Sequence, residues 1–234
     1  MDHAKDIHFL LPRLLYRDAL MLVIDKPAGI PVHKGTGGGE NLEQYFEALR
    51  FGLPRLPALA HRLDRDTSGC LVLGRHRQAL AKLGRLFETG RIQKTYWAVV
   101  QGQLAEPSGR IELALAKRSA DKSRWQMQVQ EDGQTAITDY KLLAAGDGLS
   151  WLELTPLTGR THQLRVHCAA IGHPILGDKI YGQPAADGRL QLHARAISVP
   201  LYHNKPPIVA EAPIPGHMQI YIEKLGGAKQ PEQA

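Results

Sequence analysis

Residues 92–101 read Ile92-Gln93-Lys94-Thr95-Tyr96-Trp97-Ala98-Val99-Val100-Gln101, and this stretch opens a series of segments whose apolar pattern has a period of two. That period is typical of β-strands. Four further segments follow it, joined by Gly, Asp or Ser turns: 110–115, 125–130, 135–143 and 149–155. Because consecutive strands with short turns pair antiparallel, the centre of the chain predicts an antiparallel sheet.

Helices and further strands are predicted on both sides of this series. Strands at 13–26 with a turn at Asp18, a helix after Asn41, a strand at 70–73 and a helix at 78–88 precede it. A helix at 161–171, a strand at 189–199 and a Pro-rich polar tail follow it. We therefore expect one α+β domain over residues 1–234, with a core at about 14–200 and a mainly antiparallel sheet, flanking helices and a central cleft.

The composition is that of a globular protein, with 43% hydrophobic and 22% charged residues among 234. No apolar run approaches the ~18 residues that cross a bilayer, and the N-terminus lacks the features of a signal peptide. We expect a cytoplasmic protein without a membrane partner. The two cysteines, Cys70 and Cys168, lie in separate apolar segments, which disfavours a disulfide scaffold or a Cys-rich zinc site.

The net charge of +6 is concentrated in one window. Residues 61–100 hold eight Lys or Arg against three acids, which accounts for +5. A local cationic surface is a usual footprint of phosphate-backbone binding, although a solvated helix face gives the same pattern.

Two features resemble cofactor motifs but have the wrong spacing. Lys34 precedes the Gly-rich segment Gly35–Gly39, whereas a P-loop has its Lys after the glycines, and Glu40 stands where a dinucleotide fingerprint has its last Gly. On a helix, His162 and His167 would lie ~140° apart, so they could not share a metal as an i, i+4 pair does. We expect no metal and no cofactor.

The densest polar cluster is His61-Arg62-Leu63-Asp64-Arg65-Asp66-Thr67-Ser68-Gly69, between two apolar segments. Arginines on both sides of Asp64 should lower its pKa and keep it ionised, which suits a nucleophile. Taken alone, the cluster also fits a turn capped by an aspartate with its arginines in solvent.

A second polar cluster, Gly159-Arg160-Thr161-His162-Gln163-Leu164-Arg165-Val166-His167, lies at a predicted helix start. Arg165 stands among apolar neighbours, and a cation at the core boundary needs an anionic partner. Asp64 is a candidate for that partner.

The motif His61-Arg62-Leu63-Asp64-x-x-Thr67-Ser68-Gly69 resembles the signature of the RluA family of pseudouridine synthases. The resemblance continues in family order over about residues 14–200, through Asp25–Gly29, Lys94–Gly102, Thr158–His167, Gly172–Gly182 and Leu192–Ala194. Six blocks in order are a specific signal. The chain begins almost at the catalytic domain, so we expect the compact type of this family, without a separate N-terminal RNA-binding domain.

The resemblance implies isomerisation of uridine to pseudouridine in RNA without metal or cofactor. It makes Asp64 the nucleophile, leaving open whether it attacks the sugar or the base, and it places Tyr96 near the target base, assisting removal of the carbon 5 proton. Arg165 would be the ion-pair partner of Asp64, and Leu164 would pack beside the base. Arg62 would fill the space left by the flipped uridine.

His61 and Thr67 complete the substrate-binding residues that the resemblance implies. The expected partner is structured RNA, ribosomal or transfer RNA stem-loops, bound by a monomer that needs no protein partner. Phosphates neutralised along the surface of residues 61–100 would supply much of the affinity.

Two other functions compete with this interpretation. One is an RNA-binding or RNA-folding protein that kept the scaffold without the chemistry, which the presence of Asp64, Tyr96 and Arg165 disfavours. The other is a glycoside-type hydrolase, which needs a second positioned carboxylate. Asp66 is the nearest candidate for that carboxylate.

Overall fold

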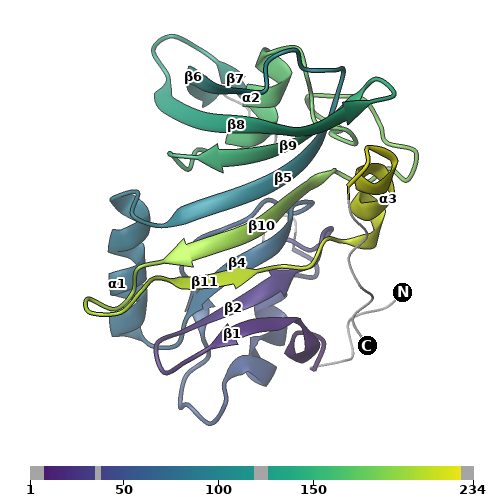
Figure 1. Cartoon of the computed structure of the whole chain (residues 1–234). Coiled ribbons are helices and arrows are strands. Elements are labelled where there is room, and N and C mark those ends of the chain that lie inside the picture. The colour runs from purple at the N-terminus through teal and green to yellow at the C-terminus, as the bar shows by residue number, and fades with distance from the viewer. Residues whose placement is uncertain (1–7, 35–37, 119–125, 228–234) are drawn as a thin grey trace. The chain divides into compact units, whose positions relative to one another are not determined.

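A computed structural model of the chain describes residues 8–34, 38–118 and 126–227 (Figure 1). The chain forms two compact units, each of which is described by itself. The first contains the chain up to Lys94 together with Ala194–Pro213, and the second contains Thr95–His193 and the chain from Ile214 onward. Both consist of mainly antiparallel strands with few helices, which confirms the predicted α+β class; the single domain and the central cleft stay predictions.

The first unit is a sheet with the strand order β1-β2-β4-β10, in which β3 also pairs with β4 and β11 with β10. The β1–β2, β2–β4 and β10–β11 pairs are antiparallel. The element bounds are η2 Leu11–Arg13, β1 Leu14–Arg17, β2 Met21–Lys26, η3 Leu42–Leu49, β3 Ala58–Leu59, β4 Ser68–Gly74, α1 Arg77–Glu88, β10 Leu192–Val199 and β11 Ile208–Glu211.

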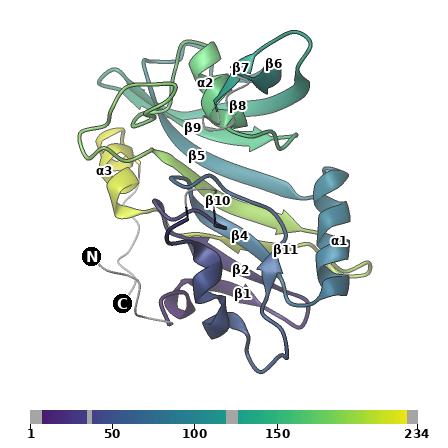
Figure 2. The same cartoon turned by 180° about the vertical axis from the view of Figure 1, so that it is seen from behind.

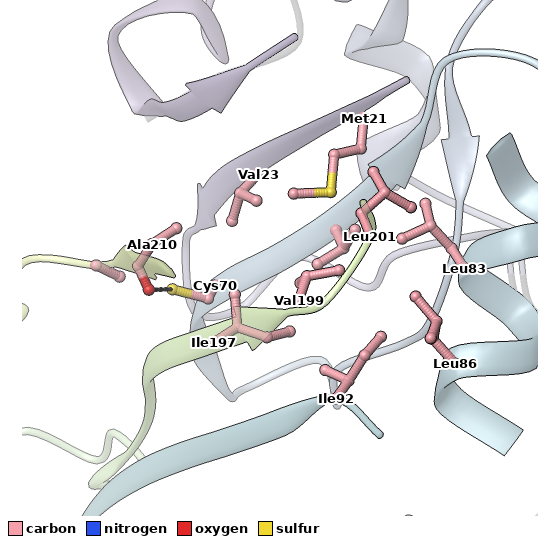
Figure 3. Packing of buried hydrophobic residues seen from close by; sticks show 12 residues of the cluster. Met21, Val23, Cys70, Leu83, Leu86, Ile92, Ile197, Val199, Leu201 and Ala210 are labelled. Carbon is pink, nitrogen blue, oxygen red and sulfur yellow. Dashed lines mark hydrogen bonds between the residues drawn. The ribbon is translucent and has the colours of Figure 1, made fainter. Parts of the chain in front are cut away.

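Strand β4 is buried along its whole length. Cys70 and Val72 on one face belong to a core cluster with Leu83 and Leu86 of α1 and with side chains of β2, β10 and β11, seen together in Figure 3. The Cys70 thiol donates to the Ala210 carbonyl oxygen at 3.5 Å, and burial raises the pKa of this thiol to about 12. Cys70 is therefore a protonated core residue that ties β4 to β11.

The second unit is an antiparallel sheet with the strand order β5-β9-β8-β6-β7. The predicted strands are confirmed, and several run longer than the sequence pattern indicated. Helix α2 packs against β6, β7, β8 and β9 (Figure 2). The element bounds are β5 Gln93–Gln101, β6 Ser108–Lys117, β7 Met127–Val129, β8 Gln134–Gly146, β9 Leu149–Pro156, α2 Gln163–Ala170 and α3 Gly216–Lys224.

Strand β5 is covered on both faces because its side chains alternate. Ala98 and Val100 pack in a cluster with Leu164 and Cys168 of α2. Val99, between them, packs in another cluster with Met218 and other side chains of α3. Helices α2 and α3 therefore cover opposite faces of β5.

Some sequence predictions need correction. The segment after Asn41 is a 3₁₀ helix, η3, that buries Leu42, Tyr45, Phe46 and Leu49, and the Asn41 side chain makes no capping hydrogen bond. The C-terminal part is no polar tail, because it holds β11 and α3. Two predicted features, the loop residues 35–37 and the strand start at Trp125, lie outside the described residues.

Candidate active site

The predicted nucleophile lies on a short turn between β3 and β4. The Thr67 amide donates to the Asp64 carbonyl oxygen at 3.2 Å, which closes the turn. Asp64 is half-buried, Arg62 is exposed and Thr67 is buried. A side chain at Gly69 would collide with the Ala194 carbonyl of β10 at 2.3 Å, so this position of the motif must be glycine for the strands to pack.

Three hydrogen bonds join the end of β2 and the segment after it to Arg65 of this turn. Buried Lys26 donates from Nζ to the carbonyl oxygens of Pro27, at 2.7 Å, and Arg65, at 2.9 Å. Gly29 and Arg65 pair reciprocally, since the Gly29 amide donates to the Arg65 carbonyl at 2.9 Å and Arg65 Nε donates to the Gly29 carbonyl at 3.0 Å. The Asp25–Gly29 motif therefore holds the backbone of the turn at Arg65, directly after Asp64.

Lys26 is a fully buried amine within electrostatic range of three carboxylates. Burial lowers its pKa to about 7, while the charges of Asp66, Asp64 and Asp25 act in the opposite direction. Burial also raises the pKa of the Asp25 carboxyl to about 6, against the charges of Arg13 and Lys26. The turn thus stands over an amine that can gain or lose its proton near neutral pH.

His61 is fixed by the strand and helix beside it. Its Nε2 accepts a hydrogen bond from the Val72 amide at 2.9 Å, and its ring stacks on Phe87 of α1 at 4.5 Å between centroids. Burial, assisted by the charge of Lys94, lowers the pKa of His61 to about 3. His61 is therefore neutral and, with Nε2 accepting, carries its proton on Nδ1. These contacts anchor the segment that leads to Asp64.

In the second unit, the structure brings Tyr96 and Leu164 together. Leu164 is buried in the cluster around Ala98 and Val100, and half-buried Tyr96 packs against the same cluster. Tyr96 stands on β5 opposite Leu154 of β9. The next residue of α2 after Leu164 is Arg165, so three of the predicted site residues lie in one region of this unit.

Arg165 forms a buried bidentate ion pair with Asp178. Its Nε and Nη2 donate to the two carboxylate oxygens at 2.7 and 2.8 Å, and both side chains are at least nine-tenths buried. Burial alone would raise the pKa of Asp178, but the hydrogen bonds and charge of Arg165, with the amides of Ile180 and Tyr181, hold it below its ordinary value. Asp178 thus holds the guanidinium in one orientation.

Tyr181 links this ion pair to the start of α2. Its ring centre lies 5.3 Å from the Arg165 guanidinium carbon, and its hydroxyl lies 2.9 Å from His162 Nδ1. The same hydroxyl accepts from the Met127 amide of β7 at 2.7 Å. His162 has a left-handed backbone, with φ of 53°, as the residue that caps α2. The Arg165 side chain is therefore set in a packed polar network.

The structure gathers the predicted residues into two groups. His61, Arg62, Asp64 and Thr67 surround one turn of the first unit, and Tyr96, Leu164 and Arg165 lie together in the second. The ion pair between Asp64 and Arg165 stays a prediction.

Sequence reasoning gave no role to Lys26, Asp178 or Tyr181, although all three lie in the quoted motifs. The available signal was chemical: a Lys inside a buried strand and an Asp in a Gly-rich segment both require polar partners.

Within the described ranges, no group of three or more His, Cys, Asp or Glu side chains is arranged to hold a metal. No helix in the same ranges has the length and apolar character needed to span a membrane.

Curated relatives match most of the chain. An uncharacterized RNA pseudouridine synthase of Zymomonas mobilis is 43% identical over 209 residues, covering 88% of this chain and 95% of the relative. The ribosomal large subunit pseudouridine synthase C of Buchnera aphidicola (Schizaphis graminum) is 35% identical, over 92% of this chain and 71% of its own length. The dual-specificity RNA pseudouridine synthase RluA of Yersinia pestis is 37% identical, over 80% of this chain and 91% of its own.

Solved structures and a family model agree with these relatives. Human RNA pseudouridylate synthase domain containing 4 aligns with a TM-score of 0.78 at 26% identity, over 94% of this chain and 95% of that one. Human RNA pseudouridylate synthase domain containing 1 aligns with a TM-score of 0.73 at 26% identity, over 98% of this chain and 100% of that one. The model described as RNA pseudouridylate synthase matches residues 20–170. The chain therefore belongs to the RNA pseudouridylate synthase family, with RluA-type relatives, and is an isomerase that acts on RNA.

Proposed function

We propose that this enzyme converts uridines to pseudouridines in stem-loops of ribosomal or transfer RNA, with Asp64 as its nucleophile. The observation that carries the nucleophile assignment is the braced turn: Lys26 and Gly29 hydrogen-bond to Arg65, the residue that directly follows one half-buried carboxylate. A nucleophile must be held in a defined place, and this turn provides that restraint. The name of the Buchnera relative supports ribosomal RNA as a substrate. The words dual-specificity in the name of the Yersinia relative support more than one RNA substrate.

The reaction that we assign to Asp64 exchanges one glycosidic bond for another. The bond between N1 of uracil and the ribose breaks, the base turns, and a bond from carbon 5 to the ribose forms. Carbon 5 then loses its proton and N1 gains one, so that substrate and product are isomers. Asp64 forms a transient covalent bond to the target nucleoside and is released at the end.

The second-unit residues position the base and the charge in this proposal. Leu164 and Tyr96, which share one apolar cluster, contact the flipped base, and Tyr96 assists loss of the carbon 5 proton. Arg165, oriented by Asp178, serves as the ion-pair partner of Asp64. Arg62, exposed beside the turn, enters the RNA where the uridine has left.

We place this activity in a cytoplasmic monomer that needs neither metal nor cofactor. His61 and Thr67 belong to the proposed site because they hold the Asp64 turn. His61 anchors the segment before the turn to β4, and the Thr67 amide closes the turn. Both residues contribute to substrate binding by holding the turn in shape.

The test replaces the nucleophile and its neighbour in parallel. Asp64→Asn should abolish tritium release from RNA labelled at carbon 5 of uridine, because the amide cannot attack, while the Kd for the RNA stays that of the wild type. Asp66→Asn is the matched control, because Asp66 is two residues away and 56% exposed. Turnover by Asp64→Asn at the wild-type rate, or equal losses in both variants, would contradict the assignment.

A further inference from the structure

A groove of about 680 Å³ lies along the exposed face of α1 in the first unit. It is lined by Gln78, Lys82, Arg85, Thr89 and Arg91 over the apolar side chain of Leu86. The spacing of 78, 82, 85 and 89 places these side chains in one stripe along the helix. We call this feature the α1 groove.

The lining of the α1 groove combines apolar surface with three cations. Lys82, Arg85 and Arg91 are exposed, no carboxylate lines the groove, and none of the three forms an ion pair with a carboxylate in the part of the chain that the structure describes. Lys82 Nζ instead lies 5.8 Å from the ring centre of Tyr202, and Lys205 Nζ lies 5.2 Å from the same centre. Three cations therefore line the groove with no carboxylate among its lining residues, and binding of a polyanion would relieve their repulsion.

The opposite side of the same helix contacts the segment of the candidate nucleophile. Phe87 stacks on His61, three residues before Asp64, and α1 packs on β4, which follows the Asp64 turn. The groove and the turn consequently belong to one unit, with α1 between the groove and His61.

We propose that the α1 groove binds the phosphate backbone of the stem that flanks the target uridine. The inference rests on the proposed function, because it takes the substrate RNA as the ligand. Lys and Arg are the residues that neutralise phosphodiesters, and Gln78 can donate to a phosphate or sugar oxygen. Such contacts set the register of the RNA without reading its sequence, while the looped-out uridine meets Asp64.

A purely structural role for these cations makes a different prediction. Lys and Arg near a helix C-terminus stabilise the helix dipole, which accounts for Arg85 and Arg91 but not for Lys82 in the middle of α1. If the role of these cations were purely structural, replacing them would lower thermal stability and leave RNA affinity unchanged.

The experiment compares two RNAs with the full-length double variant Lys82→Ala, Arg85→Ala. The probes are a hairpin RNA with a uridine-containing loop and a single-stranded oligonucleotide of the loop sequence alone. For the hairpin, we expect Kd to rise about tenfold or more at physiological salt, and the slope of log K against log salt to fall by roughly two, one for each lost phosphate contact. For the oligonucleotide, Kd should stay that of the wild type.

Two control variants sharpen the result. Arg55→Ala, Lys224→Ala removes the same charge from exposed positions outside the groove and should leave the hairpin Kd unchanged. Lys82→Arg, Arg85→Lys keeps the charge and should retain hairpin binding. Equal losses on both RNAs, an equal loss in the first control, or an unchanged hairpin Kd would overturn the proposal. Polyglutamate serves as a probe for an acidic protein. If the double variant lost polyglutamate binding but kept hairpin binding, the groove would bind an acidic protein, and this result would also overturn the proposal.

The outcomes separate this inference from the proposed function. If wild type binds the hairpin through the groove but releases no tritium from any RNA, the groove stands and the proposed function fails. If the double variant forms pseudouridine with unchanged Kd and KM for the hairpin, the groove fails and the proposed function stands.

Discussion

Lys26 shows how one buried side chain can serve both the fold and the site. Its amine replaces lost water contacts with two backbone carbonyl oxygens, one of which belongs to the turn that carries Asp64. A buried amine remains costly to charge, which is why the pKa of Lys26 falls to about 7. The charge beneath the turn is consequently adjustable by small changes in pH.

Lys26→Met tests this arrangement through pH. The pKa of Lys26 falls from 10.5 to about 7 in the folded state, so the unfolded state binds more protons between these values and the stability contributed by Lys26 rises with pH. The free energy of unfolding of the wild type should therefore rise by about 2 kcal/mol relative to that of the variant between pH 7 and pH 9. Urea unfolding across this range measures the difference.

Lys224→Met is the control, because Lys224 is exposed at the end of α3 and its variant should track the wild type at every pH. A gap between wild type and Lys26→Met that stays constant with pH would show that Lys26 keeps an ordinary pKa. Tritium release should fall in Lys26→Met, since the Arg65 carbonyl loses its brace.

At the level of elements, α3 illustrates a helix that the sequence hides. Its residues follow several prolines, its first residue is Gly216, and only Met218 and Ile222 on it are buried. These two side chains pack against Val99 of β5 and, beside it, Trp151 of β9. The helix is thus held by a sheet face distant in sequence, and neither local propensity nor apolar spacing in nine residues indicates that.

Ile222→Ala should cost about 2–4 kcal/mol of unfolding free energy, because it leaves a cavity beneath α3. Ile220→Ala on the same helix is the matched control: Ile220 is 56% exposed, and its truncation should cost less than about 0.5 kcal/mol. Thermal or urea unfolding of both variants measures the two losses of unfolding free energy. Equal losses would mean that α3 does not pack on β5 and β9 as described.

Elements with strong local signals were predictable, and those that depend on distant packing were not. The period-two pattern of residues 92–156 predicts β5, β6, β8 and β9 because each strand buries alternate side chains. For the segment after Asn41, the pattern identifies the buried face but does not distinguish a 3₁₀ helix from an α-helix.

The same distinction holds for the candidate site. Motif order singled out Asp64 and Arg165 as candidate site residues, whereas Asp178 as the buried partner of Arg165 depends on how the loop after α2 folds back. This pairing joins a residue of α2 to one 13 positions later in the loop that follows the helix, and such a loop has no periodicity from which to predict it.

At the scale of the whole molecule, the chain passes between its two units three times. The first unit needs Ala194–Pro213 as well as the chain up to Lys94. Ile197, Val199 and Leu201 from the later segment are all at least 98% buried in the cluster with Met21 and Cys70 (Figure 3). Neither part of the first unit has a complete core without the other.

Expressed alone, residues 1–94 should therefore show no cooperative thermal transition, since the face of β4 that carries Cys70 and Val72 would be open to water. Joining residues 194–213 through a flexible linker should restore a transition measurable by circular dichroism. The same joined chain with Ile197→Asp should lose this transition again, because the substitution buries a charge in the core. A cooperative transition for residues 1–94 alone would contradict this account.

The split first unit also sets an order of events during synthesis on the ribosome. Arg165 and Asp178 emerge within 14 residues of each other, so this ion pair can form as soon as its surrounding strands have left the exit tunnel. The core beneath the Asp64 turn must wait for residues 194–213, about 130 residues after Asp64 itself. The nascent enzyme thus carries its proposed nucleophile long before the core of the same unit is complete, and that core can close only after residues 194–213 have emerged.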